Sequence, residues 1–265
     1  MANTNSQSVL AAVCNRMEAE DAARTPAHAL RWTAVFIVAS ARPLTGKTFL
    51  ARLVADFLRL DGGPVEAFDL NGEPALADTL PSLTTPAELD STRGQMSLFD
   101  RLIVDDGVPK VVDLGHAQFA RFFAVMEEIG FVEQANRRAI ETVVLYAADP
   151  HPASVKAYGA LRGRFPSAVL VPVFNEAILK GRKVREAYPF ARAAAVPLQI
   201  PLLQPGLKAH ADRSGLSFAD FHGTLPVAVP LGPAFELRSW TKRTFLEFRE
   251  LELRLLLDKL RASLR

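Results

Sequence analysis

The sequence predicts an α/β protein with a mainly parallel β-sheet and helices on both faces of the sheet. Short apolar runs of strand length alternate with longer segments whose apolar residues recur at helical spacing. Polar residues follow several of these runs, and in such folds ligands bind at the carboxyl ends of the strands. With 265 residues, 49% of them hydrophobic, the chain is long enough to bury a sizeable core in one large domain.

The composition excludes several classes of protein. The only cysteine, Cys14, rules out an internal disulfide and a cysteine-only zinc site, which fits a reducing compartment. No apolar run approaches membrane-spanning length, and the polar first residues do not resemble a signal peptide. We therefore expect a soluble, cytoplasmic protein. The net charge of +2 argues neither for nor against a nucleic-acid partner.

The elements follow one another in a regular alternation. Residues 1–30 are expected to form an N-terminal extension with a helix over 8–20, residues 31–234 the core, and 235–265 a long C-terminal helix. Apolar, partly β-branched runs predict strands over 33–39, 64–71, 109–115, 142–147, 168–175 and 196–200. Helical spacing of apolar residues predicts helices over 49–58, 92–104, 117–129, 152–162 and 176–187.

The segment Ala41-Arg42-Pro43-Leu44-Thr45-Gly46-Lys47-Thr48 joins the first strand to the first helix and ends in the manner of a Walker A loop. Such a loop directs backbone N–H groups at phosphate oxygens, its lysine reaches the β- and γ-phosphates, and its threonine ligates Mg²⁺. Ala41 replaces the first glycine of the motif, and Pro43 and Leu44 restrict the backbone further. The loop is therefore either a phosphate-binding loop or a vestigial one.

Acidic and amide residues end two of the predicted strands. Asp113 suits the Walker B position, where a carboxylate holds the water shell of Mg²⁺ opposite Thr48, and Gly115 can present an N–H to the γ-phosphate. Asp69 can bind Mg²⁺ or orient an attacking water, and Asn71 can hold a water but cannot take its proton. An ordinary strand-end aspartate and a polar turn are the structural alternatives for these residues.

Two further features have both a functional and a structural interpretation. Asn175 follows an apolar strand, where its amide suits either a purine edge or the N-cap of the next helix. The densest basic cluster suits either DNA phosphates or a solvated helix face, and it consists of Lys180, Arg182, Lys183 and Arg185. The five histidines show no ligand spacing.

Together these stretches resemble the ParA/MinD family of P-loop ATPases. Residues 42–48 are similar to the family's loop K-G-G-x-G-K-[ST], so that Lys47 and Thr48 match its phosphate lysine and magnesium threonine. Arg42 stands where the family has a signature lysine that reaches the partner's nucleotide. Arginine keeps the charge but changes the length and geometry of the side chain.

The resemblance covers roughly residues 31–215 and extends to the later strands. Asp69 matches the first acid of the family's D-x-D strand end, whereas Asn71 replaces the second, which the family associates with water activation. Residues 111–115 resemble its Walker B strand, and residues 173–175 its strand ending in an adenine-contacting asparagine.

The resemblance implies an ATP- and Mg²⁺-dependent homodimerising switch with weak hydrolysis, acting in partition, positioning or maintenance of DNA or a protein cargo. It implies a catalytic set of Lys47, Asp69, Asn71 and Asp113, and metal ligands Thr48, Asp69 and Asp113. It implies nucleotide contacts from Arg42, Thr45, Gly46, Lys47, Thr48, Phe49, Gly115 and Asn175. A non-hydrolysing structural or adaptor protein, and a P-loop small-molecule ligase or kinase, are the alternatives on the same fold.

Overall fold

The computed structural model describes residues 33–60, 62–71, 76–212, 216–222, 226 and 228–264. The chain divides into two compact units, Met1–Arg31 and Trp32–Arg265, and every described residue belongs to the second. The predicted extension over 1–30, with its helix over 8–20, therefore lies outside the described residues. None of the helices in the described ranges is long and apolar enough to cross a membrane.

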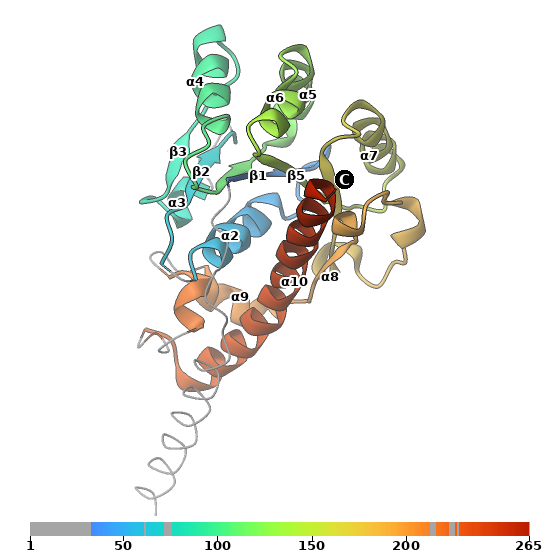
Figure 1. The fold of residues 1–265 in the computed structure, drawn as a ribbon. Helices are drawn as coiled ribbons and strands as arrows, with labels where there is room; N and C mark the ends of the chain where they lie inside the picture. Colours follow the sequence, from blue (N-terminus) through green and yellow to red (C-terminus); the bar gives the residue numbers. More distant parts are fainter. Residues whose placement is uncertain are drawn as a thin grey trace, which may run out of the picture. The chain divides into compact units, whose positions relative to one another are not determined.

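The described residues form a seven-stranded sheet in which every neighbouring pair is parallel (Figure 1). The strand order is β3-β2-β4-β1-β5-β6-β7, with β1 at the centre. The bounds are β1 Ala34–Ala39, β2 Glu66–Asp69, β3 Thr84–Pro86, β4 Lys110–Asp113, β5 Glu141–Ala147, β6 Val169–Asn175 and β7 Leu198–Ile200. The predicted parallel α/β sheet is thus confirmed.

Helices cover both faces of this sheet, as predicted. One face packs against α2 (Lys47–Leu58), α3 (Leu76–Thr79), α9 (Pro205–Ala211) and α10 (Leu231–Ser263). The other face packs against α4 (Thr92–Leu102), α5 (Phe119–Glu128), α6 (Phe131–Arg137), α7 (Pro152–Arg164) and α8 (Glu176–Leu179). Strand β1 supplies both cores because its side chains alternate, Phe36 and Val38 toward the first and Val35 and Ile37 toward the second.

The arrangement creates a topological switch point between the neighbouring strands β1 and β4. Helix α2, which follows β1, packs on one face of the sheet, whereas α5, which follows β4, packs on the opposite face. The two chain segments therefore diverge where these strands end. In open parallel sheets this is the position at which ligands bind.

Several short elements differ from the prediction. The helix predicted over 176–187 is wrong: α8 ends at Leu179 because Lys180 (φ 49°) and Gly181 (φ 78°) adopt left-handed backbone conformations. The segment predicted as a loop after β2 contains α3 and β3, and α6 follows a left-handed Gly130 (φ 59°). The C-terminal helix is present and begins at Leu231, slightly earlier than predicted.

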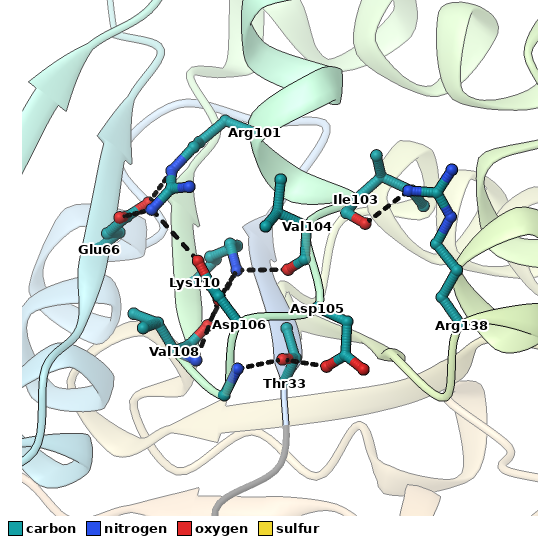
Figure 2. Close-up of polar contacts among 11 residues, drawn as sticks. Thr33, Glu66, Arg101, Ile103, Val104, Asp105, Asp106, Val108, Lys110 and Arg138 are labelled. Atoms are coloured by element: carbon teal, nitrogen blue, oxygen red, sulfur yellow. Dashed lines mark hydrogen bonds and ion pairs between the residues drawn. The ribbon is translucent and has the colours of Figure 1, made fainter.

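A buried lysine fixes the amino end of β4 (Figure 2). Lys110 is 0% exposed, and its Nζ donates to the carbonyl oxygens of Val104 (2.9 Å) and Val108 (3.0 Å) and to Asp106 Oδ1 (2.8 Å). Asp106 also forms an ion pair with Arg101 at 3.3 Å. All three ammonium protons thus have acceptors, which is the condition for keeping a charge inside a protein.

We expect the substitution Asp106→Asn to lower the free energy of unfolding by about 1 kcal/mol at neutral pH, because it removes the negative charge beside the Lys110 ammonium, although the asparagine oxygen can still accept its hydrogen bond. Burial raises the pKa of Asp106, but the Lys110 hydrogen bond, a backbone bond and the nearby cations outweigh burial, so the net shift is downward. The stabilisation is therefore present above the unfolded pKa and is lost as the pH falls through the lower folded pKa. Urea unfolding at pH 7 and pH 3 measures the difference in the free energy of unfolding between the variant and the unaltered protein, with the exposed Asp100→Asn as control. Equal losses at both pH values would contradict the electrostatic explanation.

Candidate functional site

The loop between β1 and α2 occupies the carboxyl end of the central strand. Gly46 has φ 78°, a backbone conformation that favours glycine, and a Cβ atom there would lie 3.1 Å from the side-chain nitrogen of Asn175, a tight contact. Leu44 has φ 57°, in the left-handed region that costs an ordinary residue roughly 1–2 kcal/mol. Its side chain is 93% exposed. The departure from the glycine-rich motif is thus accommodated by backbone strain at the loop tip.

The backbone of this loop presents N–H groups that have no protein acceptor. In the part of the chain that the structure describes, the N–H groups of Leu44 and Gly46 make no hydrogen bond, whereas Thr45 closes a turn on Arg42. Lys47 and Thr48 begin α2, where the N–H groups lack a partner within the helix. Consecutive N–H groups around a left-handed residue at a helix N-terminus form a concave site for an anion.

Lys47 lies folded against the same loop. The residue is 7% exposed, and its Nζ donates a 2.9 Å hydrogen bond to the carbonyl oxygen of Arg42. Burial lowers the pKa of Lys47, and attraction to the Asp113 carboxylate partly opposes that effect. The cation is therefore held beside the unpartnered N–H groups and close enough to Asp113 to feel its charge.

The polar residues at the ends of β2 and β4 lie together at the carboxyl edge of the sheet. Asn71 Nδ2 donates to Asp69 Oδ1 (2.7 Å) and to Asp113 Oδ2 (2.8 Å), so that one amide bridges two carboxylates. Asp113 is 0% exposed, and its other oxygen, Oδ1, has no hydrogen-bond partner. A buried carboxylate oxygen without a partner is unusual and suits a cation or a water that belongs to a bound ligand.

The environment of Asp113 favours its protonated form. Burial raises the pKa of this carboxyl to about 6, and the negative charge of Asp69 adds to the effect. The nearby Thr48 hydroxyl, the hydrogen bond from Asn71 and attraction to Lys47 act in the opposite direction. A raised pKa of this kind, in a carboxylate beside a lysine and a threonine at a switch point, is typical of a ligand site.

The local structure accounts for an aspartate at position 69 and a glycine at position 115. Asp69 Oδ1 also accepts the N–H of Asn71 (2.9 Å), and its Oδ2 accepts the N–H groups of Leu76 (2.8 Å) and Ala77 (3.2 Å) at the start of α3. A Cβ at Gly115 would lie 2.6 Å from the carbonyl oxygen of Leu70, so the close approach of two strand ends requires this glycine. The polar-turn alternative for Asp69 thus has a structural basis. Magnesium, catalytic and phosphate roles for these residues stay predictions.

Asn175 fills the N-cap role that its sequence position suggested, and its contact with a purine edge stays a prediction. Its Oδ1 accepts the N–H of Ala177 at 3.0 Å and caps α8, while its Nδ2 faces Gly46 in the loop. Thr45, within the loop, is buried, and the Phe49 side chain points away from the loop. The Phe49 ring packs in the core, with centroids 5.6 Å from Phe218 and 5.9 Å from Trp240. A nucleotide contact by the Phe49 side chain would require a change of rotamer.

The contacts around Arg42 were not predicted from the sequence. The Arg42 Nε lies 3.1 Å from Asp149 Oδ2, so the two side chains form an ion pair within the chain, but the Nε makes no hydrogen bond of good geometry. The Tyr188 hydroxyl donates to the carbonyl oxygen of Asp149 (2.5 Å) and accepts its N–H (3.1 Å). Asp149 follows β5, a position that the strand-end rule identifies. Tyr188 has no comparable signal in the sequence.

The basic cluster lies beyond α8 rather than on a helix face. Its four side chains are exposed, on the turn after α8 and at the start of a short 3₁₀ segment, and they are Lys180, Arg182, Lys183 and Arg185. The solvated-helix alternative is wrong in its geometry, and contact with DNA stays a prediction. No group of three or more His, Cys, Asp or Glu side chains in the described ranges is arranged to hold a metal ion.

Comparison of the chain with protein-family models finds no match, and comparison with curated proteins finds none. The functional interpretation therefore depends on the geometry of the residues themselves.

Proposed function

We propose that this protein is an ATP-binding switch of the ParA/MinD type, with weak hydrolysis, that acts in partition, positioning or maintenance of DNA or a protein cargo. One combined observation supports the proposal. The unpartnered N–H groups of the loop over 44–48, the buried Lys47 and the orphaned Asp113 Oδ1 lie together at the switch point of a parallel sheet. This is the combination of donors, cation and carboxylate that a magnesium–triphosphate requires.

The residues present fit such a ligand. The loop N–H groups would donate hydrogen bonds to phosphate oxygens, and Lys47 would exchange its bond to the Arg42 carbonyl for the β- and γ-phosphates. Thr48 and Asp113 would hold the magnesium ion, because Mg²⁺ in such sites takes one or two protein oxygens and completes its shell with phosphate and water. When bound, the ion neutralises phosphate charge.

The contacts of Asn71 support slow hydrolysis. Both of its amide protons have carboxylate acceptors, at 2.7 Å and 2.8 Å, and an amide has no basic site that takes a proton from water. The amide therefore serves to hold Asp69 and Asp113 together. We expect a protein that keeps bound ATP for a long time and changes its association state while the nucleotide is bound.

The proposal is tested by calorimetric titration of the purified protein with ATP and with ADP, with and without Mg²⁺, while its mass is recorded at each end point. Micromolar, Mg²⁺-dependent binding of ATP that changes the mass would support the switch. No heat at millimolar ATP would overturn the proposal and leave the loop vestigial. Turnover stimulated by a metabolite, rather than by DNA or a protein, would favour a small-molecule kinase or ligase.

A nucleotide-independent structural or adaptor protein is the second candidate, and two observations favour it. Leu44 strains the loop where glycine is usual, and Arg42 is already occupied by Asp149. Under this alternative the oligomeric state does not respond to ATP, and the loop retains its geometry only because it connects β1 to α2.

The substitution Leu44→Gly tests the strain at the loop tip. Glycine adopts a positive φ without strain, so the variant should have a free energy of unfolding higher by about 1 kcal/mol. The loop already has this geometry without a ligand, so the strain is present in the free and the bound protein alike, and its relief alone should leave ATP affinity unchanged. Leu44→Ala, which keeps the Cβ atom, is the matched control and should unfold in urea like the unaltered protein. Equal stabilities of the glycine and alanine variants would contradict the strain at Leu44.

A further inference from the structure

Helix α10 carries two apolar faces. The buried face contains Leu237, Trp240, Thr244, Phe248, Leu251 and Leu255 and packs on the sheet core. A second row of leucines remains 50% to 86% exposed, and we call it the leucine stripe: Leu246, Leu253, Leu257, Leu260 and Leu264. A helix that needs only to cover a sheet has a polar outer face, so this stripe requires an explanation.

The spacing of the leucine stripe is that of a coiled coil. Leu253, Leu257, Leu260 and Leu264 follow one another at intervals of 4, 3 and 4 residues, and Leu246 lies one heptad before Leu253. At 100° per residue these positions lie directly opposite the buried face. Over 18 residues the stripe is about 27 Å long, which is enough for a helix of the same length to pair with it.

We propose that the leucine stripe pairs with the stripe of a second copy of this chain, with the two α10 helices antiparallel. Charge decides both the partner and the direction. The stripe continues through Arg243 and Glu250, which are exposed in the same heptad series. A parallel pair would place each of these charges against its own copy, and like charges at such positions are unfavourable. An antiparallel pair separates them.

The antiparallel register follows from the same positions. When Glu250 lies beside Leu253 of the partner subunit, Leu246 meets Leu257 of the partner subunit and Arg243 meets Leu260 of the partner subunit. Each charge in the seam then lies against a leucine, and no two like charges meet. In this register Glu247, on the flank of the stripe, lies at nearly the same height as Arg254 of the partner subunit. The two-fold axis repeats the pair, so the flanks are self-complementary. This interface is separate from the nucleotide site and requires no ATP.

The first test is sedimentation equilibrium of the full chain without nucleotide, comparing the unaltered protein with Leu253→Glu/Leu257→Glu. We expect a dimer at micromolar concentration, and at least a 100-fold weaker association for the variant. Both leucines point away from the core, so the variant should fold, which circular dichroism checks. Met96→Glu on α4, an exposed apolar residue elsewhere, is the control and should remain dimeric. A monomeric unaltered protein, or a variant that still dimerises, would overturn the proposal.

The second test exchanges charges. Glu247→Arg alone and Arg254→Glu alone should each weaken the dimer about tenfold, because each places like charges in apposition. Glu247→Arg/Arg254→Glu together should restore it. Glu247 also accepts the N–H of Gln199 at 3.1 Å, and Arg254 pairs with Glu250 in its own helix. Loss of those contacts cannot be restored by the double exchange, so a double variant that dimerises more tightly than either single variant reports the pair between the subunits. A double variant no tighter than the single variants would overturn the antiparallel register. Lys47→Met should leave this dimer intact, which separates the outcome from that of the ATP proposal.

Discussion

The substitution Lys47→Met should lower the affinity for ATP roughly 100-fold, a loss of about 3 kcal/mol. In the free protein the ammonium has a single hydrogen bond, to the carbonyl of Arg42, and burial has already lowered its pKa. A phosphate therefore offers this cation a charged partner in place of a neutral one. Methionine keeps the buried aliphatic volume of the side chain but removes the charge, and calorimetry measures the change.

The control for this prediction is Lys156→Met, which removes an exposed lysine from α7 and should leave ATP binding unchanged. The thermal stability of Lys47→Met should not fall, because a desolvated ammonium is replaced by an apolar group in the same place. Loss of binding together with an intact fold would identify the loop as the phosphate site. Undiminished affinity would mean that ATP binds elsewhere or that Lys47 has no role in binding it.

The main strands of the sheet were predictable because they are short apolar runs in similar, buried environments. Val143, Val144 and Leu145 are buried on both faces of a parallel sheet, which gives a continuous apolar run rather than an alternating one. The carboxyl ends of parallel strands share one edge. The sequence therefore indicated polar residues at several strand ends, and at that edge Asn71 bridges Asp113 to Asp69.

Contacts that join distant parts of the chain were not predictable in this way. Asp69 anchors the start of α3 seven residues later, and Tyr188 reaches Asp149 from 39 residues away. Neither contact leaves a periodic trace in the sequence. The early end of α8 depends on left-handed conformations at Lys180 and Gly181, and the apolar spacing beyond them suggested a longer helix. Local backbone geometry outweighed the pattern at that position.

The substitution Asp113→Asn should raise the free energy of unfolding at pH 7 by up to about 3 kcal/mol, because the raised pKa of this carboxyl represents a cost of keeping it charged. Its pKa is about 6 in the folded protein against a usual value of 3.8. The folded state thus binds a proton that the unfolded state has already released. Stability therefore falls as the pH rises from about 4 to about 6, and stays lower above that range.

Urea unfolding between pH 4 and pH 7 measures this effect, with the exposed Asp78→Asn as control. Asparagine still accepts the hydrogen bond from Asn71, so the bridge to Asp69 is kept, although lost attraction to Lys47 reduces the gain. The variant should be more stable than the unaltered protein at pH 7 and equal to it near pH 4.

The variant Asp113→Asn should also lose the Mg²⁺ dependence of ATP binding, because the carboxylate oxygen that has no hydrogen-bond partner is gone. If the variant is more stable but its ATP binding still depends on Mg²⁺, then Asp113 contributes to the fold and not to a magnesium site. A stability loss at pH 7 would mean that the carboxylate is better compensated than its burial implies.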